Sequence, residues 1–370
     1  MGNLRDRLKL IQKQKHSEIS PQRISNKEQK SAVFEFSGST LKKQGWLACG
    51  YGVLKREVRL PSPFKPKEKL PSQLPVFVPD LAGRELPQVK DFVFFDLETT
   101  GLSGGGGTVA FLAAFGRVLS GYLNITQYLL LDYPGQNDFL ENVLGEFKNE
   151  NSVIVTYNGK CFDSQILKTM CIMNRIKPPE YYHADLLHPC RRLWKNIIQD
   201  CSQGSIETKM LGLDRSGDIP GMMAPEIWFD FLKTGKTEQL IEICDHNKID
   251  ISGLASIFAA IISIAKQPYH GKYEYDVGRL ALYWRAFLRR QDFQNDELRL
   301  MGENILHYAA QKDHSRAVYV YSFDQMKKGN YKTALEFVKK GLQLFDEDSQ
   351  WHKKLLRRKE RLEKFLLNPC

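Results

Sequence analysis

The chain has 370 residues, of which 42% are hydrophobic and 26% charged, a composition typical of soluble globular proteins. It excludes a collagen-like or largely disordered chain, and the length suggests two domains. Lys and Arg number 53 against 43 Asp and Glu, which gives a formal net charge of +10. The 7 cysteines are scattered without any CxxC pair, which argues against a disulfide framework or a zinc site and favours the reducing cytoplasm.

No export or membrane segment is expected. The basic N-terminus lacks the apolar core of a signal peptide. The most apolar run, Ile251 to Ala265, is shorter than the roughly 20 residues that span a bilayer, and it predicts a buried helix.

The positive charge is concentrated at the two ends of the chain. Residues 1–90 hold 18 Lys and Arg against 8 Asp and Glu, and residues 351–370 hold 7 against 2. Basic flanks suit nucleic acid, because each neutralised phosphate releases a condensed counterion. For residues 1–30, a solvated flexible arm is an equally open alternative.

The N-terminal part carries weak signals, and regular structure starts near residue 91. Residues 32–36 and 46–54 are short β-like runs, and the Pro/Lys-rich stretch 61–75 predicts an extended linker. Strands are then predicted over 92–97, 108–118, 122–132 and 153–157, the first and the last of them buried, with a turn at Ser120–Gly121. Helices are predicted over 139–147 and 161–174. This order indicates an α/β domain around a mixed sheet.

The remaining chain changes character. Residues 202–225, rich in Gly, Ser and Met, predict a long mobile or functional loop. From Thr237 onward the pattern is helical almost to the end. Between these parts, Arg191, Arg192 and Lys195 surround Trp194; this cluster either contacts phosphates and bases or is an exposed helix face with a buried Trp.

Two carboxylates end the first predicted strand, FFDLETTGL. Asp96 and Glu98 are two residues apart and therefore lie on one face of the strand. Two carboxylates beside apolar residues are costly unless they are paired, and no Lys or Arg is nearby in the sequence. A divalent cation such as Mg²⁺ or Mn²⁺ would satisfy both. The alternative is that both side chains point to solvent.

Two later segments add further polar groups. VTYNGKCFD places Asn158, Phe162 and Asp163 after a buried strand, where ligand sites of open α/β sheets form. In CDHNKID, His246 and Asp250 are four residues apart and share one helix face. Alone, Asp163 could be a helix N-cap and the His–Asp pair a structural ion pair. Together, the carboxylates can hold two metal ions while a histidine deprotonates the attacking water.

The motifs DLETTGL, YNGKCFD and HNKID, in this order, resemble the DEDD superfamily of 3′–5′ exonucleases, which have the RNase H-like fold. Within it, the bacterial YprB-like proteins, in which such a domain precedes TPR-like helices, are the most similar group. The resemblance covers about residues 91–265, and segment 183–195 is also similar. It implies two Mg²⁺ or Mn²⁺ ions held by Asp96, Glu98, Asp163 and Asp250, with His246 as general base. It also implies substrate-binding or supporting roles for Asn158, Thr99, Leu102, Phe162 and Asp185.

Two features depart from the family pattern. The His-containing subclass spaces His and Asp by five residues, whereas the spacing of four found here belongs to the Tyr-containing subclass. In addition, the glycine run 103–107 follows the first motif; it either lets the backbone approach a phosphate or forms a flexible turn.

The C-terminal helices show one repeat-like unit. Residues 329–345 match the second helix of a tetratricopeptide repeat, and residues 316–327 fit the first. Such helices either form a groove for a protein partner or are a structural appendage. The basic, amphipathic final helix either caps the array or contacts nucleic acid.

The sequence therefore predicts four parts: a basic arm (1–30), short β segments with a linker (31–90), an RNase H-like domain (91–265) and an all-α TPR-like domain (266–370). The expected function is metal-dependent 3′–5′ exonuclease action on single-stranded DNA or RNA ends. The alternative is an inactive RNase H-like nucleic-acid-binding or TPR scaffold protein. Expected partners are nucleic acid and a protein bound by the helical region, without a membrane.

Overall fold

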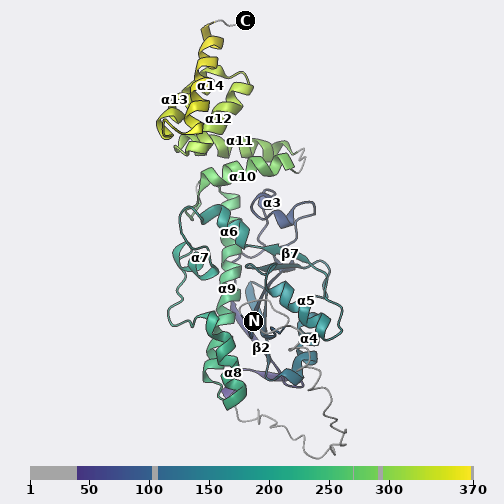
Figure 1. Ribbon diagram of the computed structural model, residues 1–370. Coiled ribbons are helices and arrows are strands. Elements are labelled where there is room, and N and C mark those ends of the chain that lie inside the picture. The colour runs from purple at the N-terminus through teal and green to yellow at the C-terminus, as the bar shows by residue number, and fades with distance from the viewer. Residues whose placement is uncertain (1–39, 102–106, 270, 291–294, 368–370) are drawn as a thin grey trace, which may run out of the picture.

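The computed structural model describes residues 40–101, 107–269, 271–290 and 295–367. An α/β part and a stack of helices follow one another along an elongated molecule (Figure 1). This confirms the expected class, a mixed sheet flanked by helices followed by an all-α region. The predictions for the basic arm 1–30, the run 32–36 and Leu102 lie outside the described residues.

A seven-stranded mixed sheet in the order β1-β2-β5-β4-β3-β6-β7 forms the centre of the α/β part. The strands are β1 (Leu47–Gly50), β2 (Val53–Pro61), β3 (Phe92–Thr99), β4 (Ala110–Leu119), β5 (Tyr122–Leu130), β6 (Val153–Thr156) and β7 (Tyr182–Asp185). Strand β3 pairs antiparallel with β4 and parallel with β6. The β4–β5 turn has positive φ at Ser120 (52°) and Gly121 (79°), the geometry that suits a tight hairpin.

The sheet begins well before residue 91, where the sequence suggested the domain boundary. Strand β2 pairs with β5 along its whole length, from Val53 opposite Leu130 to Pro61 opposite Tyr122. The extended linker expected over 61–75 is also corrected. Phe64 and Leu74 are buried in the core, because apolar side chains between the prolines cover the sheet and α9. Residues 40–91 therefore belong to the α/β part.

The two faces of β3 pack against different helices. Phe92 and Phe94 join the core cluster that contains the C-terminal half of α9 (Glu238–Lys266), and Phe92 meets Phe258 with ring centroids 4.7 Å apart. The residues between them face a second cluster with α4 (Gln136–Gly145), α5 (Asp163–Met173) and α8 (Ala224–Thr234). Because side chains alternate along a strand, Asp96 and Glu98 point to the α9 side.

Helix α9 is the central helix of the molecule, running beside the sheet (Figure 1). Its length and composition would allow it to cross a membrane, but most of its apolar residues are buried inside the fold. The prediction of a buried helix over 251–265 is thus confirmed. Gly116 of β4 allows close approach, since a Cβ there would lie 2.5 Å from Ile251 Cγ2.

The segment 202–225, expected as a loop, contains α7 (Gln203–Lys209) and the short helix η5 (Gly221–Met223). Helix α7 is fixed by packing: Ile206 and Glu207 are buried and the helix contacts α9. In α6 (Leu187–Trp194), Trp194 is fully buried and its Nε1 donates to Glu274 O at 2.9 Å. The buried-Trp alternative for this cluster is therefore the observed one, with Arg191 and Lys195 exposed.

The remaining helical elements near the sheet are short: α2 (Thr40–Lys43), α3 (Leu74–Phe77), η2 (Pro79–Leu81), η3 (Val89–Asp91) and η4 (Tyr133–Gly135). The C-terminal helices are α10 (Val277–Arg290), α11 (Asp296–Gln311), α12 (Ser315–Lys327), α13 (Tyr331–Leu344) and α14 (Gln350–Leu367). Consecutive helices pack against each other, and α10 also packs on the α/β part. That the α12–α13 hairpin is a tetratricopeptide repeat stays a prediction.

Candidate active site

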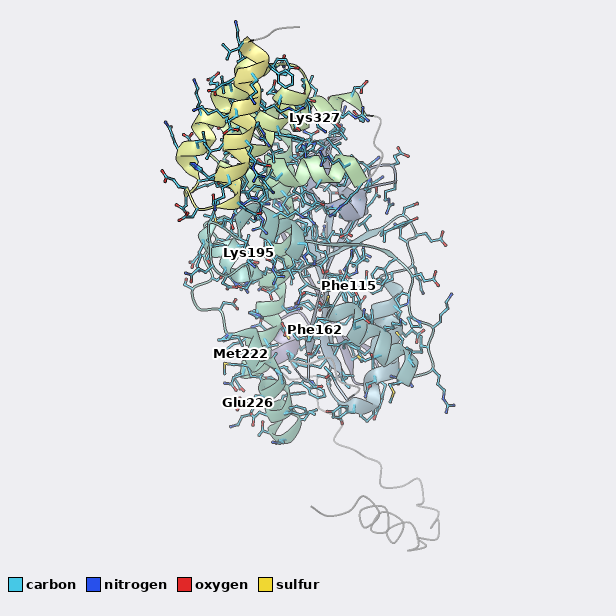
Figure 2. All side chains as sticks on the ribbon, turned by 45° about the horizontal axis from the view of Figure 1, so that its top comes forward. Phe115, Phe162, Lys195, Met222, Glu226 and Lys327 are labelled. Carbon is cyan, nitrogen blue, oxygen red and sulfur yellow. The ribbon has the colours of Figure 1, made fainter. Side chains whose placement is uncertain are left out.

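Segments from β3, the β6–α5 turn and α9 converge on one cleft of about 240 Å³. The structure brings together eight of the residues that the sequence suggested. They are Asp96, Glu98, Thr99, Asn158, Phe162, Asp163, His246 and Asp250. Phe162 lies at the centre of the α/β part, with Met222 and Glu226 of η5 and α8 to one side in the view of Figure 2. Leu102 lies outside the described residues.

Three groups of the cleft could together hold one metal ion. Glu98, His246 and Asp250 offer ligand atoms within 4.8 Å of one another. His246 Nε2 lies 3.3 Å from Asp250 Oδ2 and 4.0 Å from Glu98 Oε1. The spacing of four residues between His246 and Asp250 places both on the side of α9 that faces β3.

Asp96 and Asp163 line the same cleft with few partners of their own. Asp96 Oδ2 accepts a hydrogen bond of 2.8 Å from Asn247 Nδ2, and Asp163 Oδ1 accepts one of 3.1 Å from Leu97 N. Asp163 is 4% exposed although it is in the first turn of α5. It is therefore directed into the fold and is not a solvated N-cap.

The environment raises the pKa of three carboxyl groups in the cleft. Burial, followed by the charges of Asp163, Asp250 and Glu98, raises the pKa of Asp96 well above its usual value. Burial and the neighbouring Asp250 do the same for Glu98. Burial raises the pKa of Asp163 to about 7, against hydrogen bonds that favour the charged form. Each of these groups needs either a proton or a nearby cation.

A divalent cation fits this donor set. The ion pairs of the described residues give the four carboxylates a single Lys or Arg partner, Arg215, and Asp250 is the one carboxylate of the four that it contacts. The donors are mostly carboxylate oxygens, which Mg²⁺ and Mn²⁺ prefer. Buried negative charge that exceeds its protein partners is what a bound cation compensates.

Arg215 belongs to a cluster that nothing in the sequence singles out. Its Nη2 lies 2.5 Å from Asp250 Oδ1 and 2.6 Å from Asp218 Oδ2, and its Nη1 lies 2.8 Å from Glu207 Oε2. Burial lowers the pKa of Arg215, but the facing carboxylates raise it overall, so it stays charged. Burial raises the pKa of Glu207 to about 7 despite this pairing.

Asp218 orients the histidine. Its Oδ1 lies 2.8 Å from His246 Nδ1, on the side of the ring opposite to the cleft carboxylates. Gly221 passes close to the same ring, and a Cβ there would lie 2.8 Å from His246 Nε2. The segment 202–225 thus forms one wall of the site, and only its length and composition hinted at a function.

A buried polar network holds the side chain that donates a hydrogen bond to Asp96. Asn247 Oδ1 accepts 3.0 Å from Gln127 Nε2, and Gln127 Oε1 accepts 2.7 Å from Arg56 Nη2. Arg56 also pairs with Asp245 at 3.0 Å. The chain of contacts links β2, β5 and α9, and it fixes the amide that donates to Asp96.

Asp185 stabilises the turn after β6 and does not line the cleft. Its carboxylate accepts from Asn158 N at 2.8 Å and from Lys160 N at 3.1 Å. Asn158 has a positive φ of 65°, and at Gly159 a Cβ would lie 2.5 Å from the Thr156 side chain. Asp185 therefore supports the turn that carries Asn158, and the substrate-binding role of Asn158 remains a prediction.

Comparison with known proteins places this site in a broader context. The family model described as RNase_H superfamily matches residues 93–262. The protein YprB of Bacillus subtilis (strain 168), described as uncharacterised, is 39% identical over 168 residues, covering 45% of this chain and 40% of YprB. The match thus spans well under half of that relative's length. Residues 93–262 form an RNase H-like domain.

Two solved structures show partial likeness. E. coli exonuclease I in complex with a dT13 oligonucleotide has 18% identity and a TM-score of 0.29, over 41% of this chain and 42% of that chain. The ExoI/SSB-Ct complex has 17% identity and a TM-score of 0.32, over 48% of this chain and 41% of that chain.

Proposed function

We propose that this protein is a metal-dependent 3′–5′ exonuclease that acts on single-stranded ends of DNA or RNA by two-metal hydrolysis of the phosphodiester bond. The observation that carries the proposal is the convergence of Asp96, Glu98, Asp163, Asp250 and His246 in one cleft. Carboxylates that exceed their cationic partners are suited to hold the ions of such a reaction. The 3′–5′ direction rests on the resemblance of the three motifs.

The four carboxylates would hold Mg²⁺ or Mn²⁺, because these ions prefer oxygen ligands. When bound, such ions lower the pKa of water and stabilise the leaving 3′ oxygen. His246 then remains available for proton transfer. Its contact with Asp218 favours a proton on Nδ1, which leaves Nε2 as the acceptor facing the cleft. Phe162 and Asn158 border the cleft and would contact the terminal nucleotide.

Arg215 is the observation that favours a second candidate, a nucleic-acid-binding domain without cleavage. Its guanidinium already neutralises Asp250 through Oδ1. In an active enzyme, Asp250 Oδ2 would remain for the ion. In an inactive domain, Arg215 would take the place of that ion. The two candidates differ in whether the cleft binds a divalent cation.

The decisive experiment measures cleavage of single strands labelled at the 5′ end, with Mg²⁺ or Mn²⁺ and with EDTA. A ladder that shortens from the 3′ end, and that a blocked 3′ end prevents, is the expected result. Asp96→Asn and Asp250→Asn should abolish cleavage and weaken Mn²⁺ binding in calorimetry. Glu242→Gln is the matched control, since Glu242 is exposed on α9 one turn before His246.

Two outcomes would decide against the proposal. Cleavage that survives both Asp variants would assign the chemistry to other residues. A wild-type protein that binds single strands but neither Mn²⁺ nor Mg²⁺ would support the second candidate.

The proposal also includes a cytoplasmic location and a contribution of the basic residues 1–30 to substrate affinity. Deleting residues 1–30 should weaken binding of single strands and reduce its dependence on salt, while Mn²⁺ affinity stays unchanged. Equal affinity and equal salt dependence in the shortened protein would remove the arm from the proposal.

A further inference from the structure

The helical region contains a groove that the proposed function does not use. It has a volume of about 450 Å³ and lies between α10, α12 and α14. Five of its lining side chains are aromatic or basic: Arg279, Tyr283, Arg316, Tyr319 and Trp351. The other two are aliphatic, so none of the described residues that line this groove is acidic. We call it the aromatic groove.

The arginines of the aromatic groove are available for an anion. Within the described part of the chain, neither Arg279 nor Arg316 takes part in an ion pair, and Arg316 is exposed above the Trp351 ring at 5.4 Å. The acidic neighbour Asp276 is already engaged, at 3.6 Å from His314 and by a hydrogen bond from Asn196. Positive charge therefore remains uncompensated at this groove.

The surroundings strengthen the positive potential. Helix α14 contains seven Lys and Arg but only two Glu, in the sequence QWHKKLLRRKERLEKFLL. Lys354 lies 5.1 Å from the Trp351 ring centroid, and Arg358 lies 4.4 Å from that of Tyr319. Many nitrogen-tipped side chains surround the yellow helices in Figure 2. Long-range attraction of a polyanion follows from such clustering.

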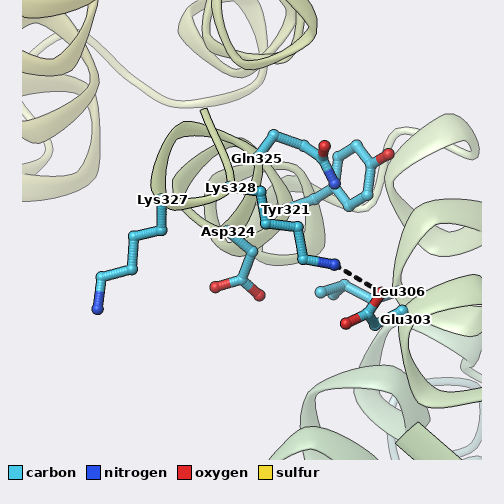
Figure 3. A pocket seen from close by; sticks show the side chains of 7 residues that line it. All are labelled: Glu303, Leu306, Tyr321, Asp324, Gln325, Lys327 and Lys328. Carbon is cyan, nitrogen blue, oxygen red and sulfur yellow. Dashed lines mark hydrogen bonds and ion pairs between the residues drawn. The ribbon is translucent and has the colours of Figure 1, made fainter. Parts of the chain in front are cut away.

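The neighbouring cavity between α11 and α12 differs in charge. Figure 3 shows Lys328 paired with Glu303 across it, with Asp324 nearby and Lys327 directed away. It has a volume of about 290 Å³ and carries both signs of charge. Its groups neutralise one another, whereas those of the aromatic groove do not.

The aromatic groove is connected to the cleft through α6. Arg192 of α6 lies 4.0 Å from the Tyr283 ring, and Asn196 accepts 3.3 Å from Arg279 Nη1. Helix α6 starts two residues after Asp185, which holds the turn of Asn158 at the cleft. Its eight residues rise about 12 Å from the end near Asp185 toward the end that contacts α10.

The aromatic groove combines rings with arginines that lack an ion-pair partner among the described residues. This combination suits single-stranded nucleic acid better than an acidic peptide. Every nucleobase presents a flat face that stacks on Tyr or Trp, and the phosphates between bases pair with Arg. On the basis of the proposed function, we propose that the aromatic groove binds a segment of single-stranded nucleic acid several nucleotides away from the bond that is cut. An end held in the cleft would thereby remain attached between successive cuts.

The test measures fluorescence anisotropy with the full chain carrying Asp96→Asn, so that strands stay intact. The probes are labelled oligo-dT of about 5 and about 20 nucleotides, lengths that bracket common single-strand site sizes. Arg279→Glu/Arg316→Glu should weaken binding of the long strand at least about tenfold and lower its salt slope by about two. Binding of the short strand should change less than about twofold.

Two further variants separate stacking and general charge. Trp351→Leu keeps an apolar contact with Tyr319 but removes a ring on which a base can stack. It should weaken binding of the long strand about fivefold or more. Lys332→Glu/Lys339→Glu on the exposed side of α13 reverses the same number of charges, so it is the matched control and should leave binding of both strands unchanged. Circular dichroism and melting curves confirm that each variant is folded.

The outcomes separate this inference from the proposed function. Equal losses of binding for the groove variants and for Lys332→Glu/Lys339→Glu, or equal losses for the short and the long strand, would overturn this inference. The inference would also be overturned if the groove variants lost binding of poly-glutamate but retained binding of the long strand. If the wild type cuts single strands, and the groove variants bind long strands normally with Asp96→Asn and cut them normally without it, the proposed function stands alone. If nothing is cut but groove-dependent binding is observed, the groove stands alone.

Discussion

At the scale of single residues, His246 depends on a partner supplied by a distant loop. Asp218 Oδ1 lies 2.8 Å from its Nδ1, and Arg215 holds Asp218 and Asp250 together. Such supporting contacts typically change activity by about 10–100-fold when they are lost. The ring of His246 is thereby given a fixed orientation.

We predict that Asp218→Ala lowers the turnover number about 10–100-fold with little change in KM, because the ring of His246 loses its orientation. Asp218→Asn should restore part of the rate, since its side-chain oxygen can still accept from Nδ1. Asp214→Ala is the control, because Asp214 is in the same loop and exposed, and among the described residues its side chain bonds only to Ser216. Turnover in Asp218→Ala equal to that of the control would contradict the orienting role.

The carboxyl groups also predict how stability depends on pH in the metal-free protein. The pKa of Asp163 is about 7 in the fold, and those of Asp96 and Glu98 are raised as well. Unfolded carboxyls titrate near pH 4, so the folded state binds more protons between about pH 4 and 7. The protonated carboxyl groups therefore contribute fully to the free energy of unfolding below about pH 4, and this contribution is lost as the pH rises through 7.

The melting temperature of the metal-free protein should accordingly fall between about pH 5 and 7.5. Asp163→Asn keeps the acceptor for Leu97 N and should make the decrease of the melting temperature with pH smaller. Added Mg²⁺ should raise the melting temperature, and most strongly at high pH. Thermal melts over a pH series check this. A melting temperature that rises over the same interval would show that other groups dominate.

At the scale of elements, α9 and the sheet define the site because they approach so closely. Gly116 of β4 has room for no side chain, as a Cβ would lie 2.5 Å from Ile251 Cγ2 and 3.2 Å from Leu123 Cδ1. Ile251 directly follows Asp250, so this contact also determines how deeply the third motif is placed. Close packing of this kind transmits any added volume to its neighbours.

We therefore expect Gly116→Ala to destabilise the protein by about 1–3 kcal/mol. In the double variant with Ile251→Ala, the penalty of Gly116→Ala should largely disappear, because the added methyl group then occupies vacated space. Gly145→Ala is the control, since a Cβ at Gly145 meets nothing within 4 Å. Chemical denaturation of the four combinations measures the coupling; additive effects would contradict the contact.

At the scale of the whole molecule, one core joins the sheet to the C-terminal helices. The same cluster contains Phe94 of β3, Phe258 of α9 and Trp284 of α10. Phe77 packs edge-on against Trp284 at 5.9 Å, which connects the segment before β3 to the helical region. The α/β part and the helices are thus coupled through buried apolar surface, not through a flexible linker.

Trp284→Ala should destabilise the molecule by about 3–5 kcal/mol, and it should lower the melting of both parts together. Trp284 is fully buried and its Nε1 donates to Leu298 O at 3.0 Å. Calorimetry should show one transition at lower temperature. A second, unshifted transition for the α/β part would indicate that the two regions unfold independently.

The sequence by itself determined the strands of the RNase H-like domain, the buried α9 and the three motifs of the cleft, because apolar runs and carboxylate spacing are local signals. Only the tertiary structure decided that β1 and β2 extend the sheet and that Phe64 and Leu74 are buried. It also placed Arg215 and Asp218 beside Asp250 and His246. Contacts between residues about 30 positions apart depend on how the loop folds back onto α9, and no periodicity in the sequence encodes that path.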